Sequence, residues 1–362
     1  MNTISLKISG DYVDSYIYSG LLFLVKNGGE IIQVNWNSLL DRKIRERGCI
    51  EFMKNCQNKI ENDFEDFAIF LDERDISDFI LDRENLEFWP NDFIIYSNVL
   101  YFSGQSGVEA IGLDFRNKKF TKENRKFIFN HRSYKLASAR NRGVAIAAGS
   151  NGVVLKSISK SLDDLVAPKV IEENSIDVEW GGTSLVVNSD SRSKIDFFKK
   201  MPDVDFREMS FSEKNEFHKS KVKNIFEKTM PGYSWSIGNR LFNLNNNQLV
   251  RSVISVEGDE EADVEIKSVE IKSENQNFDN LDSARSASFG CIIDLYSKIF
   301  LLNDAGMEEI GQDLTKWKVF PRAKNYVNHL HMIENDSLHI KIFARKEMIS
   351  RRFGISPSKI DA

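Results

Sequence analysis

The segment VDSYIYS-G-LLFLVKNGG-EIIQVNW, residues 13–36, contains three short runs of aliphatic, aromatic and β-branched residues separated by turns that carry glycine. Runs of this length, bounded by glycine, asparagine, aspartate or serine, predict antiparallel β-strands. The middle run, LLFLV, is apolar at consecutive positions, which is typical of a strand buried on both faces. The segment therefore predicts a three-stranded unit whose middle strand lies in the core.

The same arrangement recurs six more times along the chain, in copies that begin at Phe93, Lys135, Ser175, Tyr233, Ser283 and Tyr326. A further strand-like segment precedes each of these copies, beginning at Leu86, Lys126, Lys169, Val204, Val264 and Trp317. The segment ISLKIS from Ile4 has the same character. The first turns of successive copies are 39 to 78 residues apart, and four-stranded repeats of about 40–50 residues form propeller blades. The repeat predicts seven four-stranded units, some of them with insertions.

The chain ends are expected to meet in the last unit. Residues 4–9 would pair with residues 346–353, which removes an open sheet edge. We therefore predict an all-β fold: a single domain, residues 1–362, forming a seven-bladed β-propeller of four-stranded antiparallel blades, with the N-terminal strand closing the last blade. Two β-sandwiches or barrels in tandem are the alternative.

On these strands the sequence resembles β-propeller repeat proteins as a class. The third unit, GVAIAAGSNGVVLKSIS from Gly143, is similar to repeats of the photosystem II assembly-factor type. The sequence lacks the Gly-His and Trp-Asp pairs of WD repeats, the double-glycine rhythm of kelch repeats and the Asp box of sialidase-type propellers. The resemblance therefore implies the fold and no particular activity.

Composition excludes several classes of protein. The 362 residues are 41% hydrophobic, enough for a large core. With 49 basic and 54 acidic residues the formal charge is -5, which argues against a nucleic-acid partner. We recognise no signal peptide and no apolar run near the ~20 residues of a membrane span. The three cysteines, Cys49, Cys56 and Cys291, favour a reducing cytoplasm.

Residues 38–82 interrupt the first unit between its third and fourth strands. Ile60, Phe64, Phe67 and Leu71 have the spacing of an amphipathic helix. Residues 51–87 contain 12 acidic and 4 basic residues. A second acidic run, EGDEEADVE from Glu257, occupies the corresponding connection of the fifth unit. These runs are either a solvated face or a docking surface for a basic partner. Deleting residues 42–82 is expected to leave a folded ring, because the insertion joins strands that can be linked directly.

A second helical insertion is predicted over residues 212–229. Ser212 is a candidate N-cap, and Phe217, Ile225 and Phe226 form a narrow apolar stripe. Either the helix packs on the blades or it grips a partner. The tryptophans lie in or beside predicted strands, where we expect them to pack between blades: Trp36, Trp89, Trp180, Trp235 and Trp317.

The histidines are the candidate metal ligands. His329 and His331 share one face of a strand, and a hairpin turning about Asn335 would bring His339 opposite His331. Three imidazoles on neighbouring strands can bind zinc. A one-residue slip in register would separate the side chains, and half-buried histidines without a metal are the alternative. No cofactor is expected.

Polar residues on the first strands of the units would line a channel: Asp14, Arg140, Asp177, Glu179, Arg285 and His329. A carboxylate pair such as Asp14 and Asp177 could act on a sugar if the two lay about 5–9.5 Å apart. Hydrated structural residues are the alternative.

The function expected from these features is a non-catalytic platform for protein–protein interaction, with another protein as partner. Two narrower versions are a recognition subunit of a bacterial defence or other multiprotein complex, and an immunity-type protein that neutralises a toxin. A carbohydrate-active or otherwise hydrolytic propeller is the competing class.

Overall fold

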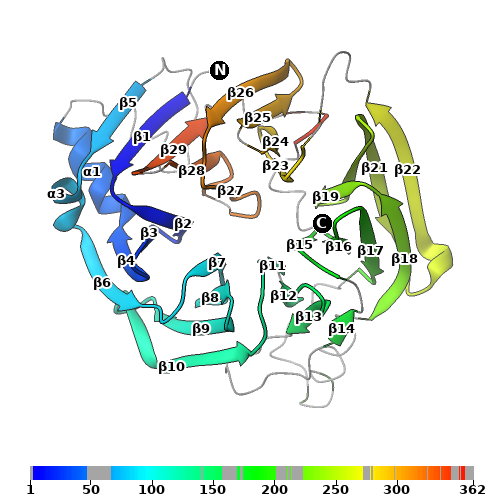
Figure 1. Ribbon diagram of the computed structural model, residues 1–362, viewed down its shortest axis with the longest axis horizontal. Helices are drawn as coiled ribbons and strands as arrows, with labels where there is room; N and C mark the ends of the chain where they lie inside the picture. The colour runs from blue at the N-terminus through cyan, green and yellow to red at the C-terminus, as the bar shows by residue number, and fades with distance from the viewer. Residues whose placement is uncertain are drawn as a thin grey trace. The chain divides into compact units, whose positions relative to one another are not determined.

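The computed structural model describes residues 3–46, 67–139, 142–156, 169–171, 174–200, 210, 213, 223–271, 278, 280–296, 298–323, 325–334, 336–343, 350 and 352–354. These residues form seven β-sheets, six of four strands and one of five (Figure 1). The predicted all-β class, a seven-bladed β-propeller with four-stranded antiparallel blades, is confirmed. The chain divides into two compact units, described separately below: unit 1 comprises residues 1–100, 111–125 and 280–359, and unit 2 comprises residues 101–110, 126–279 and 360–362.

In unit 1 the N-terminal strand closes the last blade, blade 7, as predicted. Strand β1 (Thr3–Ser9) pairs antiparallel with β29 (Ser337–Phe343), and not with residues 346–353, most of which lie outside the described residues. The assignment of strands within this blade was wrong by one: the segment at Trp317, predicted to precede the last unit, is the first strand of blade 7. The blade begins with β27 (Lys316–Val319), followed by β28 (His329–Glu334).

Two outer strands of unit 1 differ from the prediction because their sequences are polar. Blade 6 ends in β26 (Gly306–Gln312) and not at Trp317. Blade 1 ends in β6 (Ile80–Asn85) and not at Leu86. An outer strand with solvent-facing sides needs few apolar residues, so the hydrophobic pattern does not reveal it. The other strands are β2 (Tyr12–Tyr18), β3 (Leu21–Lys26) and β4 (Glu30–Asn35) in blade 1, and β23 (Ser283–Ala287), β24 (Gly290–Leu295) and β25 (Lys298–Asn303) in blade 6.

The insertion in blade 1 contains α1 (Trp36–Glu46), β5 (Phe67–Leu71) and α3 (Glu73–Ser77). Phe67 and Leu71, predicted to be helical, lie instead on β5, which pairs parallel with the free edge of β1 and so adds a fifth strand to blade 7. Ile60 and Phe64 lie outside the described residues. The range 42–82 contains β5 and the first three residues of β6, so its deletion would remove sheet residues as well as helices. That a folded ring remains after the deletion stays a prediction.

Blade 2 has strands in both units, and blades 3, 4 and 5 belong to unit 2. The strands of blade 2 are β7 (Pro90–Tyr96), β8 (Val99–Gly104), β9 (Gly107–Asp114) and β10 (Lys119–Phe129). Those of blade 3 are β11 (Lys135–Ala139), β12 (Gly143–Ala147), β13 (Val153–Lys156) and β14 (Lys169–Ile171). Blade 4 contains β15 (Asp177–Trp180), β16 (Ser184–Asn188), β17 (Arg192–Phe198) and β18 (Asn224–Pro231). Blade 5 contains β19 (Tyr233–Ile237), β20 (Arg240–Asn245), β21 (Gln248–Val256) and β22 (Val264–Ile271), with the short 3-10 helix η1 (Glu261–Asp263) before β22.

The second predicted helix is wrong over its last residues, since Asn224 onward forms the outer strand β18. Phe226 stacks on Phe197 of the neighbouring strand with ring centroids 5.5 Å apart. Ile225 and Phe226 of the predicted stripe therefore belong to a strand, in which packing against β17 outweighs helix propensity. Ser212, Phe217 and the strand predicted from Val204 lie outside the described residues.

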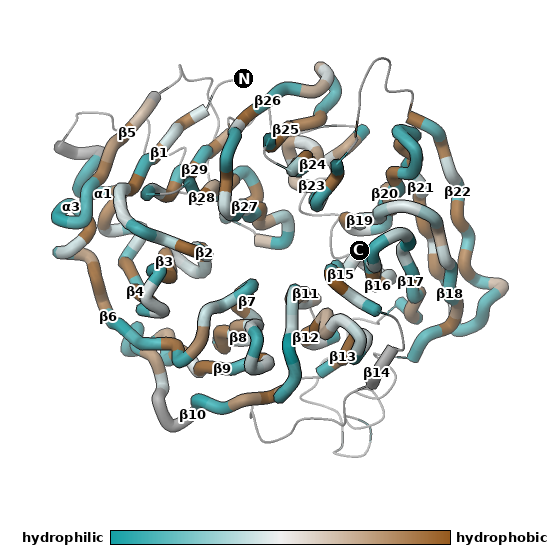
Figure 2. Tube along the Cα trace, in the orientation of Figure 1, coloured by the Kyte–Doolittle hydropathy of each residue, from teal (hydrophilic) through white to brown (hydrophobic). Residues whose placement is uncertain are grey.

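The middle strands carry the core, as their apolar runs predict. Every residue of β12 and β16 is buried, as are the first five residues of β3. Outer strands such as β22 alternate between apolar and polar residues (Figure 2). Three of the five tryptophans, Trp36, Trp180 and Trp235, are fully buried, whereas Trp89 is exposed.

Candidate functional site: inner-strand polar networks and exposed connections

The three candidate metal ligands do not face one another. In the β28–β29 hairpin His331 lies opposite Ile340, and His339 lies opposite Met332. His339 therefore projects from the other face of the sheet, where its Nε2 is 3.2 Å from the Glu334 carboxylate. The register expected from a turn about Asn335 is wrong by one residue. Among the residues the structure describes, no three His, Cys, Asp or Glu side chains are grouped to hold a metal ion.

His329 and His331 form a buried pair of neutral imidazoles. The Nδ1 atom of His331 is 2.9 Å from the Ser15 hydroxyl, and that of His329 is 3.0 Å from the Asn328 side-chain oxygen. Neither Nε2 has a hydrogen-bond partner among the described residues. Burial lowers the pKa of His329 to about 3. Burial, and then the charges of His329 and Lys318, hold the pKa of His331 well below its usual value.

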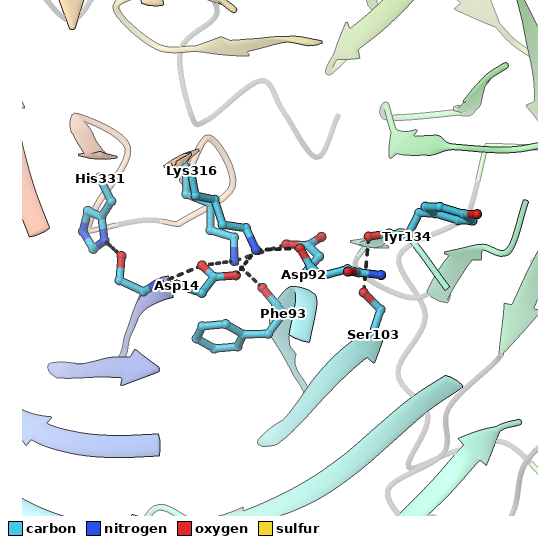
Figure 3. A network of polar contacts seen from close by, with 10 residues as sticks. Asp14, Asp92, Phe93, Ser103, Tyr134, Lys316 and His331 are labelled. Atoms are coloured by element: carbon cyan, nitrogen blue, oxygen red, sulfur yellow. Dashed lines mark hydrogen bonds and ion pairs between the residues drawn. The ribbon is translucent and has the colours of Figure 1, made fainter. Parts of the chain in front are cut away.

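Beside these histidines lies a network of buried charges centred on Asp14 of β2 (Figure 3). Its carboxylate is 2.5 Å from Lys316 Nζ and 2.8 Å from Lys318 Nζ, both on β27. Lys318 also lies 3.2 Å from the carboxylate of Asp92 and donates to the Phe93 carbonyl at 2.7 Å, both on β7. Blades 7, 1 and 2 thus meet at this network through their first strands.

Lys318 remains charged within this network. Burial by itself lowers the pKa of Lys318, but the carboxylates of Asp14 and Asp92 more than reverse the effect, so its pKa is raised. The ammonium group also lies 4.4 Å from the ring centroid of Phe93 and 5.5 Å from that of Tyr16. The two lysines and two aspartates neutralise one another, which ties three strands together.

In unit 2 the predicted channel residues Asp177 and Glu179 belong to a different network on β15. The Tyr233 hydroxyl donates a short hydrogen bond to Asp177, and the Asn188 amide donates to the same oxygen at 3.2 Å. Glu179 accepts from the backbone N–H of Ser236 at 3.1 Å. Each carboxylate therefore fastens β15 to β19, the first strand of the next blade.

The sequence-based reasoning placed the channel residues on first strands but did not find their partners. Lys316 and Lys318 were placed on an outer strand, and Tyr233 and Asn188 carried no motif. Arg285 donates to the Ala284 carbonyl at 2.8 Å, and His329 lies on a second strand. Arg140 lies outside the described residues.

Replacing Tyr233 with phenylalanine should lower the free energy of unfolding by about 1.5–3 kcal/mol, because it removes a hydrogen bond to a buried carboxylate. Equilibrium urea unfolding measures the change. Tyr12→Phe is the matched control, since the Tyr12 hydroxyl makes only a 3.3 Å bond to the Ser9 carbonyl. Equal losses in the two variants would contradict the role assigned to Asp177.

The acidic residues of α3 and Asp78, which directly follows the helix, are largely neutralised within unit 1. Glu73 pairs with Lys26 at 2.7 Å, Asp75 with Lys43 at 2.5 Å and Asp78 with Arg42 at 2.8 Å. Asp75 and the N-cap Asp72 also form a capping box, in which the backbone N–H of each residue donates to the carboxylate of the other. These carboxylates therefore present less free charge than the sequence suggests.

Exposed aromatic side chains are concentrated in unit 1. Tyr296, in the turn between β24 and β25, is 85% exposed, and Phe70 on β5 is 66% exposed. Trp89, in the connection between β6 and β7, is 53% exposed. No helix in the described part of the chain is long and apolar enough to cross a membrane.

Comparison with known proteins identifies the fold and no family. No family model matches the chain, and the curated proteins contain no significant match. Among solved structures, the chain is similar to BBS1N in complex with ARL6DN (8% identity, TM-score 0.50, covering 93% of this chain and 94% of that one). It also matches the Neurospora crassa Pan2 WD40 domain (8% identity, TM-score 0.48, covering 93% and 94%) and BamB from Moraxella catarrhalis (9% identity, TM-score 0.44, covering 90% and 82%).

Proposed function

We propose that this protein is a non-catalytic platform for protein–protein interaction. The observation that carries the proposal is the exposure of large aromatic side chains at strand connections and at an edge strand of unit 1, namely Tyr296, Trp89 and Phe70. Large aromatic side chains that are exposed on the protein surface are typical anchors of protein interfaces.

The carboxylates on the first strands support the same function, because neighbouring side chains already hold them. Asp14 is held by two lysines, and Asp177 by Tyr233 and Asn188. Catalytic acids and bases must reach a substrate, whereas these carboxylates join neighbouring strands. The competing function, a carbohydrate-active or hydrolytic propeller, would rest on Asp177 and Glu179, which lie on the same face of β15.

Two narrower functions fall within this proposal. One is a recognition subunit of a bacterial defence or other multiprotein complex, and the other is an immunity-type protein that covers a toxin. Both would use a platform with irregular insertions between repeated blades. The platform would act in a reducing cytoplasm, where the buried Cys291 would stay a thiol.

A photo-crosslinking amino acid placed at position 89 or 296 tests the proposal in the native host. We expect a discrete protein adduct at one or both positions, identified by mass spectrometry, and none at the exposed control position 262. The result that overturns the proposal is the absence of adducts together with glycoside or ester hydrolysis that is lost in Asp177→Asn or Glu179→Gln.

A further inference from the structure

One end of the strands in unit 1 forms a continuous rim. Strands alternate in direction within each blade, so second-to-third connections lie at the same end as the connections that lead into the next blade. In blades 7 and 1, backbone hydrogen bonds join neighbouring connections at this end: Gly10 N–H donates to the Asp336 carbonyl at 2.9 Å, Asn27 N–H to the Asp11 carbonyl at 3.1 Å, and Leu86 N–H to the Gly29 carbonyl at 2.9 Å. We call residues 10–11, 27–29, 86–89, 296, 313–315 and 336 the Trp89 rim.

The Trp89 rim displays two aromatic side chains, Trp89 and Tyr296, that contribute little to the fold. Both are mostly exposed. Tyr296 also has a backbone φ of 63°, a left-handed conformation that costs a non-glycine residue roughly 1–2 kcal/mol. A large apolar side chain held at such a position without burial gains nothing for stability. An external partner would account for its presence.

The charge of the rim indicates the chemistry of that partner. Asp11, Glu87, Asp313 and Asp336 are exposed, and none of these carboxylates forms an ion pair with a residue that the structure describes. Three lysines near this end are engaged in other ion pairs: Lys26 with Glu73, Lys298 with Glu309 and Lys316 with Asp14. The rim thus presents uncompensated negative charge beside Trp89, whereas the carboxylates of α3 are paired.

We propose that the Trp89 rim docks a basic, extended protein segment. Arginine or lysine side chains of the segment would meet Asp11, Glu87 and Asp336, and one of them would stack on the Trp89 indole in a cation–π contact. This inference deepens the proposed function and rests on it. It assigns docking to the end of unit 1 at which Trp89 lies, in place of the acidic insertion suggested by the sequence.

The test is binding of a fluorescein-labelled twelve-residue peptide of alternating arginine and serine to the full chain, followed by anisotropy. We expect Glu87→Gln with Asp336→Asn to weaken binding about tenfold and to reduce its salt dependence. Trp89→Ala should weaken it about fivefold, and Trp89→Phe less. The matched control is Glu227→Gln with Glu265→Gln, which removes the same number of exposed, ion-paired charges from β18 and β22 and should change affinity less than about twofold.

Three results would overturn the inference: an equal effect of the control pair, unchanged binding by Trp89→Ala, or equal binding of a peptide with glutamate in place of arginine. The crosslinking experiment separates the two proposals. A partner captured at position 89 or 296 that lacks a basic segment leaves the platform function standing and removes the inference. Specific peptide binding without any captured protein removes the platform function instead.

Discussion

Replacing Asp14 with asparagine lowers the free energy of unfolding by about 3–5 kcal/mol, the loss expected when one member of a buried ion pair is removed. Asp14 is 1% exposed, and the Lys316 and Lys318 side chains that it neutralises are 13% and 15% exposed. Without the carboxylate, two ammonium groups remain close together with only Asp92 as a charged partner among the groups described here. Equilibrium urea unfolding at pH 7 measures the loss.

The Lys298–Glu309 pair is the control for this prediction. Its side chains are 51% and 38% exposed, and its atoms are 2.6 Å apart. Glu309→Gln should therefore change stability by less than about 1 kcal/mol. The double variant Asp14→Asn with Lys316→Met should recover part of the loss, because the uncompensated cation is removed. A loss for Asp14→Asn as small as that for Glu309→Gln would contradict the role that we assign to this network, which is to hold the first strands of blades 7, 1 and 2 together.

The protein should lose roughly 4 kcal/mol of stability as the pH falls from 7 to 5, about 2 kcal/mol for each of His329 and His331. Their folded pKa values lie below the value near 6.5 that they regain on unfolding. The unfolded chain therefore binds protons that the folded chain excludes. This contribution is fully present above pH 6.5 and decreases as the pH falls toward 3.

Urea unfolding at half-unit intervals between pH 7 and pH 5 measures the slope. His329→Phe should remove about 2 kcal/mol of this loss, since the imidazole is buried and its Nε2 has no partner among the described residues. The half-buried His339, whose pKa burial also lowers, remains in this variant. His131→Asn is the control, because His131 is an exposed residue before β11 and should leave the slope unchanged. If the free energy of unfolding depended on pH equally in His329→Phe and in the original protein, groups other than His329 would cause the acid sensitivity. Lys318 and, through Ser15, Asp14 are the charged groups that neighbour this pair.

How far the fold could be predicted depended on where each strand lies in its blade. Middle strands such as Leu21–Lys26 and Gly143–Ala147 are buried on both faces, so their composition alone reveals them. Outer strands such as Gly306–Gln312 face solvent, and their polar sequences cannot be distinguished from loops by hydrophobic pattern. The same ambiguity made Phe67–Leu71 and Asn224–Pro231 resemble helices, because three or four apolar residues fit either periodicity.

The candidate sites were harder to predict than the fold. The zinc hypothesis required His331 opposite His339, but the hairpin pairs Glu334 with Ser337, and this one-residue shift in register places the two histidines on opposite faces. The pairing of Asp14 with Lys318, 304 residues away, leaves no trace in local patterning. Likewise, no feature of the sequence shows that Glu73 and Asp78 are neutralised while Glu87 is not.

The amino-acid sequence by itself determined the number of blades, their middle strands and the return of the N-terminal strand to the last blade. These features depend on hydrophobic periodicity, which is a local property that each strand carries in its own composition. Tertiary structure alone decided which strand neighbours which charge, where the acidic side chains find partners and which aromatic residues remain outside. Those outcomes depend on register and on contacts between distant segments, and a displacement of one residue reverses them.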